Sequence, residues 1–314
     1  TALLFHIYGD QTIREVVSVF LSLLLLLEKM TVSAAMNARI MGSGKETVIL
    51  AHGYGGDQSV WDKILPYLAQ CCRVLVFDWC FSGAVAHLNL FDPDRYSSFD
   101  AFADDLIALV QELNLSPSVF IGHSVSGMIG CVASTKRPDL FKRLILLGAS
   151  PRYLNAQDYE GGFERSAVEQ MFMTIESNFS SWVPKFACLL IGEEHPLALE
   201  MYEKCLGRMR PEIALSLAKT IFLSDVRDVL ERVQVPCTIV QTSHDAVIPI
   251  SVARYMQSKI KGESTLEIIE NDNHYPQLTA PQLLLNVVGR VIGVGFDDNT
   301  ELPFPSADGP SVAA

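Results

Sequence analysis

One stretch decides the fold: Phe120–Gly127, which reads FIGHSVSG. Apolar, β-favouring residues run into a turn of small residues, and a helical pattern follows. This is the context in which a sharp strand-to-helix turn holds a serine hydroxyl clear of the backbone. The usual pattern is G-x-S-x-G, and here Ser126 takes the place of the last glycine. Because a serine is still small enough for the turn, Ser124 is the candidate nucleophile.

Ser124 needs a base and an orienting carboxylate, since a serine hydroxyl is a poor nucleophile near neutral pH. In enzymes built on this turn the chain order is Ser, then Asp or Glu, then His. Asp245 and His274 follow in that order, and each comes just after a predicted strand, where this type of sheet places ligands. We therefore predict a catalytic triad of Ser124, Asp245 and His274. His123 and His244 compete as the base, but neither follows the last strand.

An oxyanion that forms during acyl transfer needs two backbone N–H donors. We expect Val125, the residue after the nucleophile, to supply one of them. The other is expected from the segment 52–56 (HGYGG), which follows the predicted strand at 47–50. Within that segment Tyr54 is the candidate donor. The alternative is a glycine-rich turn with no catalytic part.

Short β-favouring runs alternate with helical patterns from residue 47 onward. The predicted strands lie at 47–50, 73–78, 119–122, 143–148, 237–241 and 265–269. A helix opened by Ser97, with Asp100 completing a capping box, follows the second strand, and a last helix covers 283–292. Strands separated by helices imply a mostly parallel sheet with helices on both faces. Together with the serine turn, this pattern predicts an α/β-hydrolase fold.

The rhythm of strands and helices breaks between residues 151 and about 224. Helical patterns rich in Phe, Tyr, Trp and Met fill this interval, and no convincing strand is visible. The interval is too long for an ordinary connection. We interpret it as a helical lid inserted into the sheet domain, in which most aromatic residues pack the lid and a minority line a pocket beneath it.

The composition excludes several classes of protein. The 314 residues carry a net charge of −12 and no basic stripe, which argues against nucleic-acid binding. No histidine pair has zinc-ligand spacing, and Gly53, Gly55 and Gly56 do not form a dinucleotide fingerprint, so we expect no metal and no cofactor. The seven cysteines are odd in number. Reduced thiols in a reducing compartment are therefore expected, and a disulfide framework is the alternative.

The chain divides into three parts. Residues 1–35 are expected to form an extension outside the fold, 36–294 the hydrolase domain, and 295–314 a disordered tail. The extension holds an apolar run at 16–27, which is shorter than the roughly 20 residues of a membrane span. We expect no membrane partner and a protein of the cytoplasm and nucleus. A secreted or membrane-tethered form is the alternative if residues 1–29 act as a signal.

Several segments together resemble the strigolactone and karrikin receptor family of plant α/β-hydrolases, the DWARF-fourteen-like proteins. The segments are His52–Asp62 (HGYGGDQSVWD), Gly122–Gly130 (GHSVSGMIG), Ala149–Phe163 (ASPRYLNAQDYEGGF), Met209–Asp225 and His274–Pro281. The resemblance covers about residues 36–294, and the stretch at 149–163 makes it specific because it lies in the lid. Residues 77–84 (FDWCFSGA) are most similar to the DLK-type third branch.

The resemblance implies a four-helix lid over an apolar pocket, and we expect the protein to be a monomer. It also implies slow hydrolysis of butenolide-bearing ligands, and ligand-dependent binding of an F-box protein and repressor proteins. The pocket residues carried over by position, besides Tyr54, are His123, Tyr153, Phe163, Phe186, Tyr202 and Phe222. Tyr54 and Tyr202 stand where the family usually has Phe, which predicts a more polar ligand. Asn273 replaces the usual Gly before the histidine.

Three functions remain open at this point. The first is a serine hydrolase acting on an ester or lactone, and the second is a receptor that reports a bound signal through its lid. The third is a general carboxylesterase with no signalling role. Enzymes of the same fold with a carboxylate nucleophile are disfavoured by Ser124.

Overall fold

The computed structural model describes residues 31–86 and 90–296, and their centre is a seven-stranded sheet. The strand order is β1-β3-β2-β4-β5-β6-β7, and every neighbouring pair is parallel except β1 with β3. The strands are β1 (Arg39–Met41), β2 (Glu46–Ala51), β3 (Cys72–Val76), β4 (Ser118–His123), β5 (Phe141–Leu147), β6 (Cys237–Thr242) and β7 (Ser264–Ile269). The predicted, mostly parallel architecture is confirmed.

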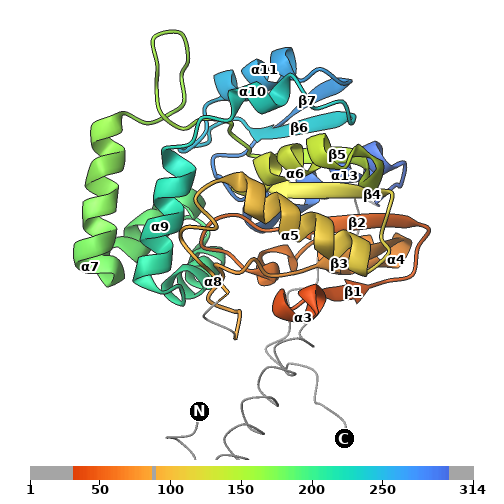
Figure 1. The fold of residues 1–314 in the computed structure, drawn as a ribbon, viewed down its shortest axis with the longest axis horizontal. Helices are drawn as coiled ribbons and strands as arrows, with labels where there is room; N and C mark the ends of the chain where they lie inside the picture. The colour runs from red at the N-terminus through yellow and green to blue at the C-terminus, as the bar shows by residue number, and fades with distance from the viewer. Residues whose placement is uncertain (1–30, 87–89, 297–314) are drawn as a thin grey trace, which may run out of the picture.

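Helices connect the strands and cover both faces of the sheet (Figure 1). They are α3 (Val32–Ala35), α4 (Leu65–Cys71), α5 (Phe99–Glu112), α6 (Val125–Lys136), α7 (Arg165–Ile191), α8 (Pro196–Gly207), α9 (Pro211–Phe222), α10 (Arg227–Leu230), α11 (Ile250–Lys259), α12 (Pro276–Thr279) and α13 (Pro281–Ile292), with 3₁₀ turns η1 (Gln58–Trp61) and η2 (Pro138–Leu140). α5 and α6 pack against each other, and α6 also lies on β4 and β5.

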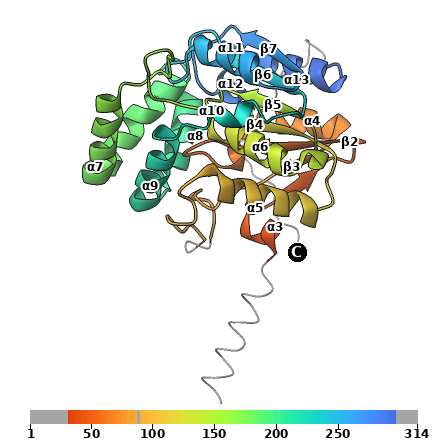
Figure 2. The same cartoon turned by 45° about the horizontal axis from the view of Figure 1, so that its top comes forward.

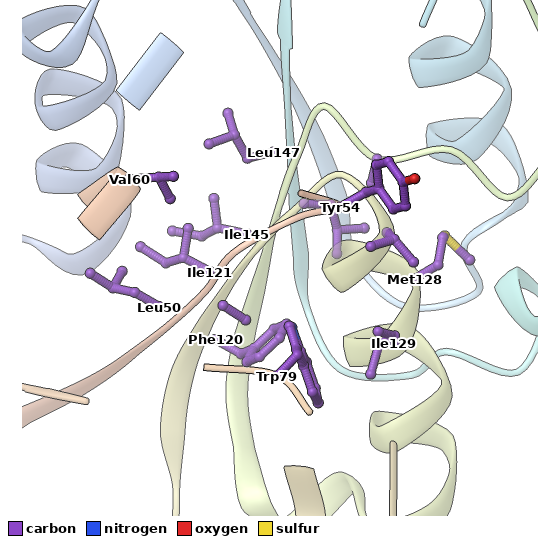
Figure 3. Close-up of a cluster of buried hydrophobic side chains, with 14 of the residues drawn as sticks. Leu50, Tyr54, Val60, Trp79, Phe120, Ile121, Met128, Ile129, Ile145 and Leu147 are labelled. Atoms are coloured by element: carbon purple, nitrogen blue, oxygen red, sulfur yellow. The ribbon is translucent and has the colours of Figure 1, made fainter. Parts of the chain in front are cut away.

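The core is formed where the central strands meet these helices. Residues of β4 are buried on both faces, so the strand reads as a continuous apolar run instead of an alternating one. Figure 3 shows Ile121 of β4 beside Ile145 of β5 on one side of the strands, whereas Phe120 of β4 points to the other side. This rigid centre is what positions the turn between β4 and α6.

The structure adds one strand that the sequence does not predict and corrects the N-cap of one helix. β1 was not predicted, because its three residues are all exposed and too few to show a pattern. It pairs antiparallel with β3 at the edge of the sheet. The N-cap of α5 is Ser98, whose hydroxyl accepts the N–H of Asp100, and not Ser97. Ser97 donates its hydroxyl to the carbonyl of Asp94 in the preceding turn instead.

The ends of the described chain pack on the domain. Residues 31–35, which we had placed in the extension, contain α3, and the N–H groups of Val32 and Ser33 donate to the Glu112 carboxylate at the end of α5. Phe296, at the start of the predicted tail, packs against the core. The expectations for residues 1–30 and 297–314 lie outside the described residues. Within the described ranges, no helix is both long and apolar enough to cross a membrane.

The insertion predicted at 151–224 contains α7, α8 and α9, which lie together beyond one end of the sheet (Figures 1 and 2). α7 is kinked at Asn178, where the backbone leaves helical geometry, so the lid consists of four helical segments. At the base of the insertion Arg152 and Asp225 form an isolated β-bridge and a salt bridge. The two ends of the lid are therefore tied together where the chain leaves and rejoins the sheet domain.

Candidate active site

Ser124 occupies the strained turn that its sequence context predicts. Its φ of 55° and ψ of −123° lie in a backbone region that residues other than glycine rarely adopt. Such strain persists only where the surrounding structure enforces it. The small neighbours are necessary, because a β-carbon on Gly122 would lie 2.6 Å from the backbone of Ser126, and one on Gly127 would lie 2.5 Å from Cβ of Ala149. The turn sets Ser124 at the N-terminus of α6, at the carboxyl end of β4.

The structure brings the three predicted triad residues together. His274 Nε2 lies 3.0 Å from Ser124 Oγ, and His274 Nδ1 lies 2.7 Å from Asp245 Oδ2. A carboxylate can only accept hydrogen bonds, so Nδ1 carries the proton and Nε2 is left as the acceptor for the serine hydroxyl. All three residues come from loops at the carboxyl ends of β4, β6 and β7. His244 is instead exposed and pairs with Asp272, which removes it as a candidate base.

Both carboxylate oxygens of Asp245 accept hydrogen bonds. Its Oδ1 accepts the N–H groups of Val247 and Ile248, and its Oδ2 accepts Nε2 of Gln241 as well as the proton of His274. Burial by itself raises the pKa of Asp245, but the charge of His274 and these hydrogen bonds outweigh it and lower the pKa below its usual value. The carboxylate is therefore ionised and fixed in orientation.

The oxyanion loop lies directly against the nucleophile. A β-carbon on Gly53 would come within 3.1 Å of Ser124 Cβ, so the loop between β2 and η1 needs glycine there. His52 donates its Nδ1 proton to the Gly53 carbonyl, and its Nε2 accepts the N–H of Trp79. Within the described chain the N–H groups of Tyr54 and Val125 have no hydrogen-bond acceptor. Both N–H groups are thus free to bind an oxyanion, and their catalytic role stays a prediction.

A pocket above Ser124 is lined mostly by apolar and aromatic side chains and has an empty volume of about 300 Å³, which includes space open to solvent. Its lining residues are Tyr54, Ser124, Tyr153, Phe186, Leu190, Ile221, Phe222, Val247, His274 and Tyr275. Four of the predicted pocket residues are in this set, and three are not. Leu190, Ile221, Val247 and Tyr275 were missed; Leu190 stands four residues after Phe186 on α7, which is the one signal that helical spacing offered.

The three predicted pocket residues that do not line the pocket contact other parts of the site. Phe163 packs edge-on against Phe222, with ring centroids 5.4 Å apart, so it supports the wall from behind. Tyr202 is fully buried beneath the loop that carries Tyr54. His123 lies behind the triad, where its Nε2 is 2.9 Å from the His274 carbonyl. Burial, with the neighbouring His274, lowers the pKa of His123 well below its usual value and keeps it neutral.

The expectation of a more polar ligand is not supported by these contacts. The hydroxyl of Tyr54 donates to the Ala214 carbonyl, and that of Tyr202 donates to the Tyr54 carbonyl. Both added hydroxyls are therefore satisfied by the protein and add no free polar group to the pocket. Asn273 does not disturb His274 either. Its Nδ2 donates to Glu194 in the lid, and the N–H of His274 donates to the Leu190 carbonyl.

The described residues contain no group of three His, Cys, Asp or Glu side chains arranged to hold a metal ion. Their geometry is that of acyl transfer by a serine nucleophile. Ser124 Oγ attacks a carbonyl carbon while its proton passes to His274 Nε2, and Asp245 stabilises the resulting imidazolium. The free N–H groups of Tyr54 and Val125 are available to bind the oxyanion. His274 then gives its proton to the leaving oxygen as the bond between that oxygen and the carbonyl carbon breaks, which leaves the acyl group on Ser124. A water molecule that loses a proton to His274 attacks the acyl carbon, and the proton returns to Ser124 Oγ as the acid is released. The site is that of a serine hydrolase.

Comparison with known proteins agrees with this chemistry. The model of the α/β-hydrolase fold family matches residues 46–281. Strigolactone esterase D14 of Arabidopsis thaliana is 43% identical over 258 residues, covering 82% of this chain and 96% of that protein. Karrikin insensitive 2 receptor IA of Petunia hybrida is 42% identical over 265 residues, covering 84% and 96%.

A solved structure, that of a hydrolase from Oleispira antarctica, superposes with a TM-score of 0.80 at 33% identity. It covers 83% of this chain and 96% of its own. The predicted fold and the predicted resemblance are both confirmed. The chain belongs to the α/β-hydrolase family and, within it, to the group of strigolactone esterases and karrikin receptors.

Proposed function

We propose that this protein binds a small butenolide, or a related lactone or ester, and hydrolyses it slowly through Ser124, His274 and Asp245. The observation that carries the proposal is the complete triad beneath an apolar lid pocket, with hydrogen-bonding distances of 2.7 and 3.0 Å. Relatives named strigolactone esterase support the substrate class. A ring ester presents the one group this site can attack, a carbonyl carbon, to Ser124.

The side chains that line the pocket support a small, mainly apolar ligand. Phe186 and Phe222 supply apolar walls, and burial raises the pKa of Tyr153, which keeps its hydroxyl protonated as a donor. A ligand with an ester at one end and an apolar body at the other fits this arrangement.

The test is to incubate the protein with a butenolide-bearing analogue and examine it by intact-mass and peptide mass spectrometry. We expect adducts on Ser124 or His274, and release of the hydrolysed product in solution. Ser124→Ala is the control, and it should lose both the serine adduct and product release. Unchanged mass and no product from the wild-type protein, under conditions in which a generic acetyl ester is turned over, would contradict the butenolide proposal and favour a general carboxylesterase.

A receptor role is a second candidate function, because several relatives at 42% identity are named karrikin insensitive 2 receptors. In this role the lid helices α7, α8 and α9 would present a ligand-dependent surface to an F-box protein and repressor proteins. Ser124→Ala separates the two roles. If the variant loses ester turnover but still captures such partners only when ligand is present, signalling does not need hydrolysis. If no butenolide changes partner capture or the melting temperature, the receptor role is wrong.

We also propose that the protein works in the cytoplasm and nucleus. All seven cysteines are free thiols, and Sγ of Cys71 lies 3.6 Å from Sγ of Cys72 without a bond between them. Such thiols are stable in a reducing compartment. Imaging of a full-length fluorescent fusion tests this, and a signal confined to the secretory pathway would overturn it.

A further inference from the structure

Three buried tyrosines outside the triad meet at the loop that carries the oxyanion donor. Tyr54 lies on that loop, Tyr202 comes from lid helix α8, and Tyr275 follows the catalytic His274. Their exposed fractions are 6%, 0% and 1%, and the rings of Tyr202 and Tyr275 lie 4.7 Å apart. Burial raises the pKa of each hydroxyl, so all three stay protonated and act as donors.

Two of these phenols converge on one atom. The Tyr54 carbonyl oxygen lies 2.8 Å from Tyr202 Oη and 3.1 Å from Tyr275 Oη. A carbonyl oxygen has two lone pairs, so it accepts both protons. The phenol of Tyr54 itself donates to the Ala214 carbonyl on α9, at 2.9 Å. Tyr54 is therefore held through its main chain from two sides and through its side chain from a third.

The packing leaves this loop no room to move. Gly55 has a φ of +72°, and a β-carbon there would lie 2.7 Å from Tyr202 Oη. On the other side, the glycine before Tyr54 is in close contact with Ser124. The loop is thus enclosed between the lid tyrosine and the nucleophile. A small shift of Tyr54 changes the direction of its N–H relative to an oxyanion at Ser124.

We propose that Tyr202 and Tyr275 are positioning residues, which hold the Tyr54 N–H in place for the oxyanion. The inference rests on the hydrolytic function proposed above. Because Tyr202 belongs to lid helix α8, it also makes the oxyanion donor depend on the lid: displacing α8 removes one of the two donors that hold the loop.

The shared acceptor predicts a non-additive effect. Removing one hydroxyl leaves the Tyr54 carbonyl with the other donor. Removing both leaves a buried carbonyl without a partner, and a loop that has to move to find one. We expect Tyr202→Phe and Tyr275→Phe each to lower kcat about threefold, and the double variant to lower it about thirtyfold or more. The double loss should stay below the roughly 10²–10³-fold cost of deleting an oxyanion donor outright.

The experiment compares p-nitrophenyl acetate with its thionoester, in which sulfur replaces the carbonyl oxygen. A sulfur anion accepts hydrogen bonds weakly, so the ester-to-thionoester rate ratio reports the oxyanion donors. We expect the ratio to fall in step with kcat, with KM changed less than twofold. The matched control is Tyr159→Phe, since Tyr159 also donates from a buried phenol to a carbonyl, that of Arg152, outside the pocket. Its ratio should equal that of the wild type.

The outcomes are distinguishable. If the wild-type protein turns over neither substrate, the proposed hydrolysis fails and this inference fails with it. If the wild type is active and the double variant keeps its kcat and its rate ratio within twofold, the positioning role is wrong while the hydrolase stands. Should the double variant not fold, Tyr202→Phe alone decides. Tyr202 does not line the pocket, so an unchanged ratio in that variant overturns the proposal.

Discussion

Replacing Asp245 by asparagine tests the triad more sharply than removing the carboxylate, because the substitution keeps the size and shape of the side chain. The N–H groups of Val247 and Ile248 point at Oδ1, at 2.8 and 3.1 Å, so the amide oxygen of the introduced asparagine has to take that position. The amide NH₂ group then faces His274 Nδ1, which can only accept from it. The imidazole is forced to carry its proton on Nε2, directed at Ser124.

A histidine in this tautomer cannot take the serine proton. The equivalent change in a serine protease triad lowers kcat by about 10⁴-fold. We expect a loss of the same order here, which corresponds to about 5 kcal/mol of transition-state stabilisation. The assay is steady-state hydrolysis of p-nitrophenyl acetate, with KM determined separately. Because binding does not depend on the tautomer, the loss should be in kcat.

The matched control is Asp139→Asn. Asp139 lies in η2, at the amino end of β5, where it pairs with Arg137 at an exposed site far from the triad. It should keep wild-type kcat. Melting temperatures of both variants show whether any loss reflects unfolding. A folded Asp245→Asn protein with kcat within tenfold of the wild type would refute the assignment of Asp245 as the orienting carboxylate.

Three further predictions concern stability. Burial lowers the pKa values of His52 and His123, so below about pH 6.5 the unfolded chain binds more protons than the native protein. The free energy of unfolding, measured in urea, should therefore fall between pH 7 and 5, by up to about 1.4 kcal/mol per pH unit for each histidine. A free energy of unfolding that does not change over this range would contradict the prediction. Gly55→Ala should lower the free energy of unfolding by about 2 kcal/mol or more, because the new β-carbon would clash with Tyr202 and Leu206 and the positive φ of this residue disfavours a side chain. Thermal melting measures the loss, and an unchanged melting temperature would show that the loop can relax. Arg208→Ala should lower the free energy of unfolding by about 1 kcal/mol, because it leaves the buried Asp57 carboxylate without the cation that the lid supplies. The loss should be smaller when Arg208→Ala is made in the Asp57→Asn variant. Equal losses in the wild type and in that variant would refute the coupling between the two residues.

Much of the fold could be predicted because central parallel strands are buried on both faces. That burial makes β4 a continuous apolar run that even a single sequence displays. β1 escaped prediction because an exposed edge strand of three residues obtains its structure from pairing with β3. The cap of α5 was misplaced by one residue, since Ser97 and Ser98 both precede an acidic residue and only the backbone geometry distinguishes them.

Within the site, prediction was good where chemistry dictates residue type and poor where packing decides. Ser124, Asp245 and His274 are marked by order and by position after strands. Phe163 and Leu190 are both apolar residues of the lid, and nothing local indicates that the second faces the pocket while the first stands behind Phe222. Tyr202 was placed in the pocket, yet its hydroxyl is engaged by the main chain of Tyr54.

The sequence by itself determined the α/β-hydrolase architecture, the triad and the presence of a helical lid, because periodicity, turn chemistry and chain order are local or follow the chain direction. The tertiary structure alone decided the shape of the pocket and the partners of its tyrosines. Those depend on side chains from α7, α8 and α9 meeting a loop that lies far earlier in the chain, at distances that only packing sets.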